Sequence, residues 1–519
     1  MKTIRLKNFR SLKDTGKIEI KPVTILLGQN SSGKSTFLRS LALLKQGIGV
    51  RAREPFLWVG DLVDFGGISE TVSNFSDEGC LSFSYDFEMP SSSVLLRRTT
   101  VSSKESVENI PCSISITERL HPKDGAAAFE YLIDIENENF SFALSRVGEF
   151  VSFEINGVDY LNLVVNSLSA KVWKGPVPTF TRKNSTDVFE DFDGSSDFRD
   201  FTKALREFID ARVHGRTGEQ KRDSLLYTLT RFPFSAFRLV KNHYIGDTKW
   251  RKHCWTWTEE SKGFIELKNL LLGYRFLDFV NMASDYTLEV LESAKYITPL
   301  RASAERYYRK QGLAVDELDA QGANFALFLD NMSPKDRNSF SDWCESFFGV
   351  SIFVEESGGH LSLFIKSQDK QSVMVNIADT GFGFSQMFPI LAQLWVVQHA
   401  KTESKSSKLN IPLIFSIEQP ELHLHPKLQA SLADVFVNSV TAARSIGVEL
   451  KLVIETHSEY LVNRLGYLIA KSKFSSEDVS VLIFERKGYS EGTNIRHASY
   501  SSRGFLENWP YGFFEPDNL

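Results

Sequence analysis

The sequence predicts an α/β fold organised around one glycine-rich loop, and the loop and its flanks support this prediction. Residues 28–36 read Gly-Gln-Asn-Ser-Ser-Gly-Lys-Ser-Thr and match the pattern G-x-x-x-x-G-K-[ST] at every position. They follow an apolar run, residues 23–27, that is typical of a short buried strand. They precede apolar residues at helical spacing from Phe37 to Leu44. A strand, a loop and a helix in this order are what the motif requires.

The chemistry of this loop predicts a nucleotide site that uses ATP and Mg²⁺. Backbone N–H groups of such a loop wrap the phosphates, and the positive end of the helix dipole faces them. We expect Lys34 to reach the β- and γ-phosphates and the Ser35 hydroxyl to bind Mg²⁺. The alternative is a glycine-rich turn that matches by chance. The predicted nucleotide-binding residues of the loop are Gly28, Asn30, Ser31, Gly33, Lys34, Ser35 and Thr36.

Length and composition predict a soluble protein with about two to four structural units. The chain has 519 residues, of which 42% are hydrophobic and 24% charged, as in ordinary folded proteins. A net charge of −5 argues against a protein that coats nucleic acid non-specifically, so any such contact must be local. The 4 cysteines include no C-x-x-C pair, and no apolar stretch is long enough to cross a membrane. We therefore expect a cytoplasmic protein without a signal peptide, a zinc site or a disulfide framework.

Periodicity divides the chain into four segments. Residues 1–90 carry the loop. Hydrophobic and polar side chains then alternate, and Asn156-Gly157 is a hairpin signal, so we expect an antiparallel β subdomain over residues 91–165. Residues 166–295 predict a helical insertion without persistent heptads. Residues 296–519 contain further apolar runs that predict buried strands.

The insertion is the least informative segment. Residues 198–213 and 263–294 predict helices, and residues 185–200, rich in serine and aspartate, predict a loop. Residues 238–257 mix aromatic side chains with arginine and lysine, as surfaces that bind single-stranded nucleic acid do. The alternative, which we favour, is a packing element anchored by tryptophans with a solvated basic face.

The N-terminal strand resembles a known family. Residues 4–11, Ile-Arg-Leu-Lys-Asn-Phe-Arg-Ser, follow the pattern I-x-L-x-N-F-[RK]-S ahead of the phosphate loop, as in the ABC-type ATPases of the SMC, RecF and OLD group. The resemblance implies a split ABC-type ATPase head, in which both ends of the chain contribute to one mixed sheet. It also places residues 61–70 near the γ-phosphate, with Asp64 and Glu70 as candidates. The alternative for that segment is a glycine turn between a helix and a strand.

A second glycine-rich segment precedes a predicted helix, residues 387–399. Residues 379–386 resemble the divergent signature loop of this group, D-x-G-x-G-x-S-Q, and such a helix N-terminus is another anion site. One ATPase fold needs a single site, so the second implies an ATP held between two copies, with Ser385 reaching the γ-phosphate on the partner's Lys34. The alternative is a plain helix cap. The resemblance thus implies a homodimer or higher oligomer and adds Gly383, Ser385 and Gln386 to the nucleotide-binding residues.

Polar residues after two apolar strands complete the predicted catalytic site. Glu418 directly follows the apolar run 411–417. A carboxylate at the end of a buried strand is costly unless it serves a cation, so we expect Glu418 to bind Mg²⁺ through water. The family usually has glutamate at the next position, where it polarises the attacking water. This chain has Gln419, which favours slow hydrolysis unless Glu421 supplies the carboxylate.

The second strand ends in Glu-Thr-His-Ser, residues 455–458, which resembles the family's switch-histidine motif. His457 should therefore contact the γ-phosphate or the attacking water. His423 and His425 could be read as a metal pair, but the resemblance places His425 in a loop at the dimer interface, so we reject a metal site there.

Two further segments resemble a subgroup of stand-alone ATPases found beside nucleases in prokaryotic defence operons. Residues 296–307 follow Y-[IL]-x-P-x-R-x-x-x-x-R-Y, and residues 509–514 follow W-P-x-G-F-F. Arg301 or Arg306 would contact phosphate or the facing copy, and the alternative is a salt bridge within the lobe.

The resemblance implies a regulatory ATPase that controls a separate toxic effector in anti-phage defence. Too little chain follows His457 for the Toprim nuclease domain of OLD proteins. The chain is similar to the PtuA-type ATPases of Septu systems and retrons, whose partner is an HNH nuclease; a Toprim effector, as in PARIS, is the nearest alternative. Two other functions stay open: a DNA repair or recombination ATPase of the RecF or SMC type that binds nucleic acid, and a nucleotide-sensing scaffold that never turns over.

Overall fold

The chain divides into two units, each with its own set of strands and helices. The computed structural model describes residues 1–75, 78–90, 109–123, 125–183, 199–231, 247–315, 317–368, 373–399, 411–486, 488 and 491–509. Unit 1 comprises Met1, Gly47–Leu57 and Glu78–Leu288, and unit 2 comprises Lys2–Gln46, Trp58–Asp77 and Glu289–Leu519. Three sequence predictions fall largely outside the described residues: the loop at 185–200, the first half of the basic aromatic segment at 238–257, and the C-terminal motif at 509–514.

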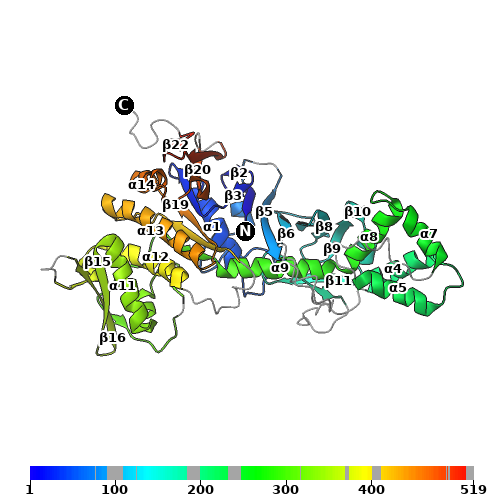
Figure 1. Ribbon diagram of the computed structural model, residues 1–519, viewed down its shortest axis with the longest axis horizontal. Coiled ribbons are helices and arrows are strands. Elements are labelled where there is room, and N and C mark those ends of the chain that lie inside the picture. Colours follow the sequence, from blue (N-terminus) through cyan, green and yellow to red (C-terminus); the bar gives the residue numbers. More distant parts are fainter. Residues whose placement is uncertain are drawn as a thin grey trace. The chain divides into compact units, whose positions relative to one another are not determined.

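The strand that leads into the phosphate loop lies in the middle of a 7-stranded mixed sheet in unit 2, with the order β13-β18-β19-β4-β20-β21-β22. β4 pairs in parallel with β19 on one side and with β20 on the other. An N-terminal strand is thus enclosed by two C-terminal strands, as the blue and orange-to-red ribbons of Figure 1 show. The strands are β4 (Val23–Gly28), β13 (Lys295–Ile297), β18 (Leu413–Glu418), β19 (Leu450–Glu455), β20 (Val479–Glu485), β21 (Asn494–Tyr500) and β22 (Leu506–Glu507).

The central strands of this sheet are buried along their whole length. Every residue of β4 and β19 is buried, which is why both segments are continuous apolar runs instead of alternating ones. The register pairs Glu418 with Glu455 and Glu455 with Leu26, so the last residues of β18 and β19 lie at the edge of the sheet from which the loop after β4 leaves. The helices with buried apolar faces in this unit are α1 (Lys34–Gln46), α12 (Phe382–His399), α13 (Pro426–Ser445) and α14 (Glu459–Ala470).

Smaller elements complete unit 2. Strand β1 (Thr3–Phe9) pairs with β2 (Leu12–Asp14) and β3 (Ile18–Glu19). A 4-stranded sheet contains β14 (Tyr308–Arg309), β15 (Val350–Ser357), β16 (His360–Ser367) and β17 (Val375–Asn376). The remaining helices are α2 (Ile68–Thr71), α10 (Phe325–Asn331) and α11 (Pro334–Phe348), with 3₁₀ turns at Ile377–Asp379 and Ser476–Asp478.

The strands of unit 1 form an antiparallel meander, as their alternating pattern predicts. Each strand from β5 to β10 pairs with the next, and Asn156 and Gly157 turn the last hairpin with φ of 52° and 74°. A separate ribbon pairs β11 with β12. The strands are β5 (Cys80–Pro90), β6 (Asn109–Arg119), β7 (Phe129–Ile135), β8 (Glu138–Leu144), β9 (Phe150–Ile155), β10 (Val158–Asp159), β11 (Leu168–Trp173) and β12 (Pro178–Arg182); a 3₁₀ turn spans Leu161–Leu163.

The middle of the chain supplies the helices α4 (Arg199–Arg212), α5 (Glu219–Arg231), α7 (Thr248–Thr256), α8 (Lys262–Tyr274) and α9 (Phe276–Ser293). The single helix expected over 263–294 is therefore two helices that meet at Arg275. In α7, Trp250 is buried and meets the buried Trp257 edge-on at 5.9 Å. Lys249 Nζ donates to the backbone oxygens of Ala211 (3.0 Å) and Val213 (3.3 Å). These contacts are those of a packing element.

The predicted fold class is confirmed: a mixed α/β protein whose nucleotide-loop sheet uses both ends of the chain, with an antiparallel sheet and helices from the middle. Within the described ranges, none of the helices combines the length and the apolar character that crossing a bilayer requires. All 4 cysteines are buried and unpaired with one another.

Candidate nucleotide-binding site

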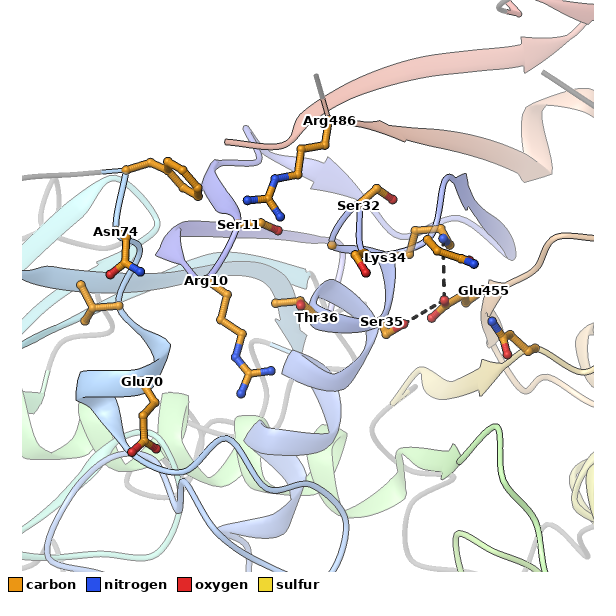
Figure 2. Close-up of a pocket in the computed structure, with 16 residues that line it drawn as sticks. Arg10, Ser11, Ser32, Lys34, Ser35, Thr36, Glu70, Asn74, Glu455 and Arg486 are labelled. Carbon is orange, nitrogen blue, oxygen red and sulfur yellow. Dashed lines mark hydrogen bonds and ion pairs between the residues drawn. The ribbon is translucent and has the colours of Figure 1, made fainter. Parts of the chain in front are cut away.

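A cavity of about 850 Å³ lies against the loop between β4 and α1, and all of its lining residues belong to unit 2. Three of them are cations, Lys34, Arg10 and Arg486, which suits a polyanionic ligand. Figure 2 shows these side chains around the loop. The other lining residues are Ser11, Asn30, Ser31, Ser32, Gly33, Ser35, Thr36, Glu70, Val72, Asn74, Phe75, Gln419 and Glu455.

The path of the loop depends on its two motif glycines. Gly28 and Gly33 have φ of +149° and +98°, where other residues are strained. A Cβ on Gly28 would lie 2.3 Å from the backbone oxygen of Phe484, and one on Gly33 would lie 2.8 Å from Ser11 Oγ. Strand β20 at Gly28 and the turn between β1 and β2 at Gly33 therefore approach the loop too closely for a side chain at either position.

Lys34 folds over the loop that contains it. Its Nζ donates to the backbone oxygens of Gly28 (2.9 Å) and Gln29 (2.8 Å), and it lies 4.0 Å from Glu455 Oε1. Burial lowers the pKa of Lys34, and the nearby Glu455 carboxylate opposes that change. A phosphate in the cavity would offer this ammonium group a charged acceptor in place of two neutral carbonyls.

Glu455 is the carboxylate closest to the motif serine. Ser35 Oγ donates to Glu455 Oε1 at 2.8 Å, as the dashed lines of Figure 2 show. Burial first, and then the nearby Glu418 charge, raise the pKa of Glu455 to about 7. The described residues contain no cluster of three or more histidine, cysteine or acidic side chains suited to a metal. Mg²⁺ is commonly bound by one or two protein oxygens together with substrate phosphates, and Ser35 with Glu455 fits that arrangement.

Glu418 is held by its own unit and does not line the cavity. Arg39 makes a two-pronged contact with its carboxylate, Nε to Oε1 and Nη2 to Oε2, each at 2.8 Å. Tyr296 OH donates to the same Oε1 at 2.6 Å, and its pKa is raised by burial and by Glu418. Arg301 Nη2 donates to the backbone oxygen of Glu418 at 2.7 Å. The residue expected to bind Mg²⁺ is thus paired with a cation and a phenol.

Of the other predicted catalytic residues, one lines the cavity and two lie outside its lining. Gln419 lines the cavity with a left-handed φ of 41°. Glu421 is buried outside the lining, and its Oε1 accepts from the backbone N–H of His457 at 2.7 Å. Partial burial and Lys34 lower the pKa of His457 to about 4, so its imidazole is neutral at pH 7. Glu421 therefore holds the backbone at His457, whereas Gln419 lines the cavity.

The glycine–serine segment at the start of α12 is not part of this cavity. Ser385 is buried, and its Oγ donates to the backbone oxygen of Phe382 at 2.8 Å. Gln386 is also buried; its side chain accepts from Arg301 N (3.2 Å) and donates to Arg301 O (3.1 Å). Gly383 packs so closely that a Cβ would lie 2.9 Å from the backbone oxygen of His423. The segment is a compact helix start that touches the loop after β18.

Other side chains singled out in the sequence have local partners. Arg306 pairs with Asp379 in an exposed ion pair, which is the salt-bridge alternative. Asp64 accepts from the backbone N–H of Gly66 at 2.7 Å in a turn, whereas Glu70 reaches the cavity. His425 caps α13, with Nδ1 accepting from Lys427 N at 3.3 Å.

Sequence reasoning missed several residues of the site. Arg10 lies inside the N-F-R-S motif but had no assigned role, and Arg486, Asn74 and Phe75 carry no motif at all. Glu455 could have been found, because it ends a buried strand just as Glu418 does. Thr493 Oγ1 donates to the backbone oxygen of Ser32 at 2.8 Å and supports the loop from a segment 461 residues away.

The fold and the site together define a P-loop nucleotide-binding protein. The family model of the AAA ATPase domain matches residues 1–142 and 290–462, which is more than half of the chain. The chain belongs to this ATPase family. The two matched stretches contribute β4 and the strands β18 and β19 that flank the site.

Heads of SMC proteins are among the solved structures that are similar to the chain. They include an SMC head bound to the C-winged helix domain of ScpA (11% identity, TM-score 0.36, 96% of this chain and 98% of that one). An SMC head with an extended coiled coil bound to the C-terminal domain of ScpA, derived from Pyrococcus furiosus, has 12% identity and a TM-score of 0.32, with 96% of each chain covered. The SMC head domain from Thermotoga maritima has 10% identity and a TM-score of 0.31, with 96% and 98% covered. No curated protein matches the chain.

Proposed function

We propose that this ATPase binds Mg²⁺ and ATP in the cavity, hydrolyses ATP slowly, pairs through the nucleotide and regulates a separate nuclease in anti-phage defence. The observation that carries the nucleotide part is the convergence of Lys34, Ser35 and Glu455 on one cavity at the N-terminus of α1. Backbone N–H groups of the loop and the helix dipole favour phosphate there. Mg²⁺, when bound, neutralises charge on the phosphates.

We expect slow turnover because the cavity is lined by Gln419. Gln419 lines the cavity where this class usually has a glutamate, and an amide can orient a water but cannot accept its proton. Glu421 does not replace that carboxylate directly, because it is bonded to the backbone of His457 outside the lining. The neutral His457 can still donate or accept one hydrogen bond at the γ-phosphate.

Pairing is supported by the place of the segment that was predicted to form a second anion site. Gly383 and Ser385 do not line the cavity, so in one copy they have no phosphate to bind. Phe382, at the start of the same helix, is 56% exposed and lies 5.6 Å from the exposed His423 ring. A second copy would cover this apolar contact and bring Ser385 to a nucleotide bound on the other loop.

Sedimentation with the slowly hydrolysed analogue ATPγS tests the pairing. The wild type should shift to a dimer or larger species, and Lys34→Ala should not, because it loses the phosphate contact. Phe382→Arg should bind the analogue and stay monomeric, and Val158→Arg, at an exposed position of unit 1, is the matched control that should still pair. A wild type that stays monomeric at saturating ATPγS would refute nucleotide-dependent pairing.

The effector role rests on the resemblance of the sequence to defence ATPases. In cells that carry the complete operon, Lys34→Ala should abolish protection against phage while the protein remains folded and expressed. Protection equal to that of the wild type would eliminate the ATP-dependent role. A nuclease that copurifies with the wild type and becomes active when ATP is supplied would identify the effector.

One observation favours the alternative of direct nucleic-acid binding. Trp255 is 68% exposed, and the Arg251 guanidinium lies 4.8 Å from its ring centre, so a base could stack on this indole. Trp255→Ala should then weaken binding of single-stranded DNA in a salt-dependent assay, while Tyr227→Ala, another exposed aromatic position of unit 1, should not. No binding by the wild type at low salt would eliminate this alternative.

A further inference from the structure

Two glutamates occupy equivalent places at the end of neighbouring strands. Glu418 is the last residue of β18, Glu455 is the last residue of β19, and the two are paired across the sheet. Both are at most 2% exposed. Only one of them needs to accompany Ser35 at a cation, so their surroundings decide which one does.

The Glu418 carboxylate has no unused oxygen. Arg39 engages both oxygens at 2.8 Å, and Tyr296 adds a third donor at 2.6 Å. A buried carboxylate whose charge is matched by a guanidinium gains little from a cation and would have to release Arg39 to approach it. These contacts tie α1, β13 and β18 together, which is a structural task.

The Glu455 carboxylate has the opposite surroundings. One oxygen accepts from Ser35 and lies 4.0 Å from Lys34, while Oε2 is buried without a hydrogen-bond partner among the described residues. A buried carboxylate oxygen without a partner is costly, and the cost is relieved by a proton or a cation. Glu455 also lines the cavity, and Glu418 does not.

We propose that Glu455, and not Glu418, is the carboxylate that faces Mg²⁺ beside Ser35, and that Glu418 is a structural anchor for Arg39 and Tyr296. The inference rests on the proposed nucleotide site and assigns its metal-facing residue. It moves the acidic partner of the motif serine from β18 to β19, the strand directly beside the loop strand β4.

The Mg²⁺ dependence of nucleotide binding tests this assignment without measuring hydrolysis. The affinity for a fluorescent ATP analogue is determined with excess Mg²⁺ and with excess EDTA, and their ratio is compared between variants. Glu455→Gln keeps an oxygen for Ser35 but removes the charge, and it should lower the ratio roughly tenfold or more. Glu418→Gln should leave the ratio within about threefold of the wild type.

A double variant controls for the chance that Glu418→Gln changes Mg²⁺ binding only by destabilising the protein. Arg39→Met combined with Glu418→Gln removes the buried cation and its anion together and should keep the Mg²⁺ ratio of the wild type. The single substitution Glu418→Gln should lower the temperature of thermal unfolding measured without nucleotide. Glu455→Gln should leave that temperature unchanged.

The outcomes separate the two levels of the argument. A ratio that falls in Glu418→Gln or in the double variant as far as in Glu455→Gln would overturn the assignment, as would an unchanged ratio in Glu455→Gln. A wild type whose affinity is the same with Mg²⁺ and with EDTA would overturn the proposed Mg²⁺–ATP site itself.

Discussion

Replacing Arg39 with methionine should destabilise the sheet of unit 2 without touching the cavity wall. The variant leaves the Glu418 carboxylate, 2% exposed, with Tyr296 as its one remaining side-chain donor among the described residues. Two charge-assisted hydrogen bonds of about 1.5–3 kcal/mol each are lost. Because Arg39 is 39% exposed, water can partly replace it, and we expect a net loss of about 2–3 kcal/mol.

Native-state hydrogen exchange of the β18 amides measures this loss locally, which suits a chain of two units that need not unfold together. Exchange limited by opening of the sheet should accelerate by about 30- to 150-fold. Arg5→Met is the control, since Arg5 and Asp14 form a similar pair whose side chains are 33% and 39% exposed. That control should change stability by less than about 1 kcal/mol.

The double variant Arg39→Met/Glu418→Leu should recover most of the lost stability, because it removes the uncompensated charge as well as its partner. If Arg39→Met lowers the free energy of unfolding by no more than Arg5→Met does, the proposed role of Glu418 as an anchor is wrong. If the double variant is no more stable than the single one, buried charge is not the cause of the loss.

Three further changes have defined outcomes. Burial raises the pKa of Glu118 from 4.5 to about 8, so the stability that it contributes to unit 1 is full below pH 4.5 and lost as pH rises to about 8. Glu118→Gln should remove this pH dependence, a total of about 5 kcal/mol, from the free energy of unfolding measured against pH. Glu421→Ala should slow hydrolysis about tenfold at unchanged nucleotide affinity, because His457 loses its anchor; an equal loss of affinity would contradict this. Thr493→Val should weaken nucleotide binding about fivefold through the unsupported Ser32 carbonyl, and an unchanged dissociation constant would show that the bond is unimportant.

Local patterns accounted for several elements of this fold. Continuous apolar runs identified β4, β18 and β19, and alternation identified the meander of unit 1, because burial on two faces or on one face leaves different periods in the sequence. The break between α8 and α9 was not predicted, since both helices are apolar on the side that they bury and no proline separates them.

The sequence by itself determined the phosphate loop, the strand and helix on either side of it, and the α/β class, since motifs and apolar periods along the chain indicate all of these. Only the tertiary structure decided which of two equivalent strand-end glutamates meets Ser35. That choice depends on Arg39 and Tyr296, which come from α1 and β13 and occupy Glu418. Both glutamates end apolar strands in the sequence. A pattern along the chain does not show which cationic side chain contacts each of them in the folded protein.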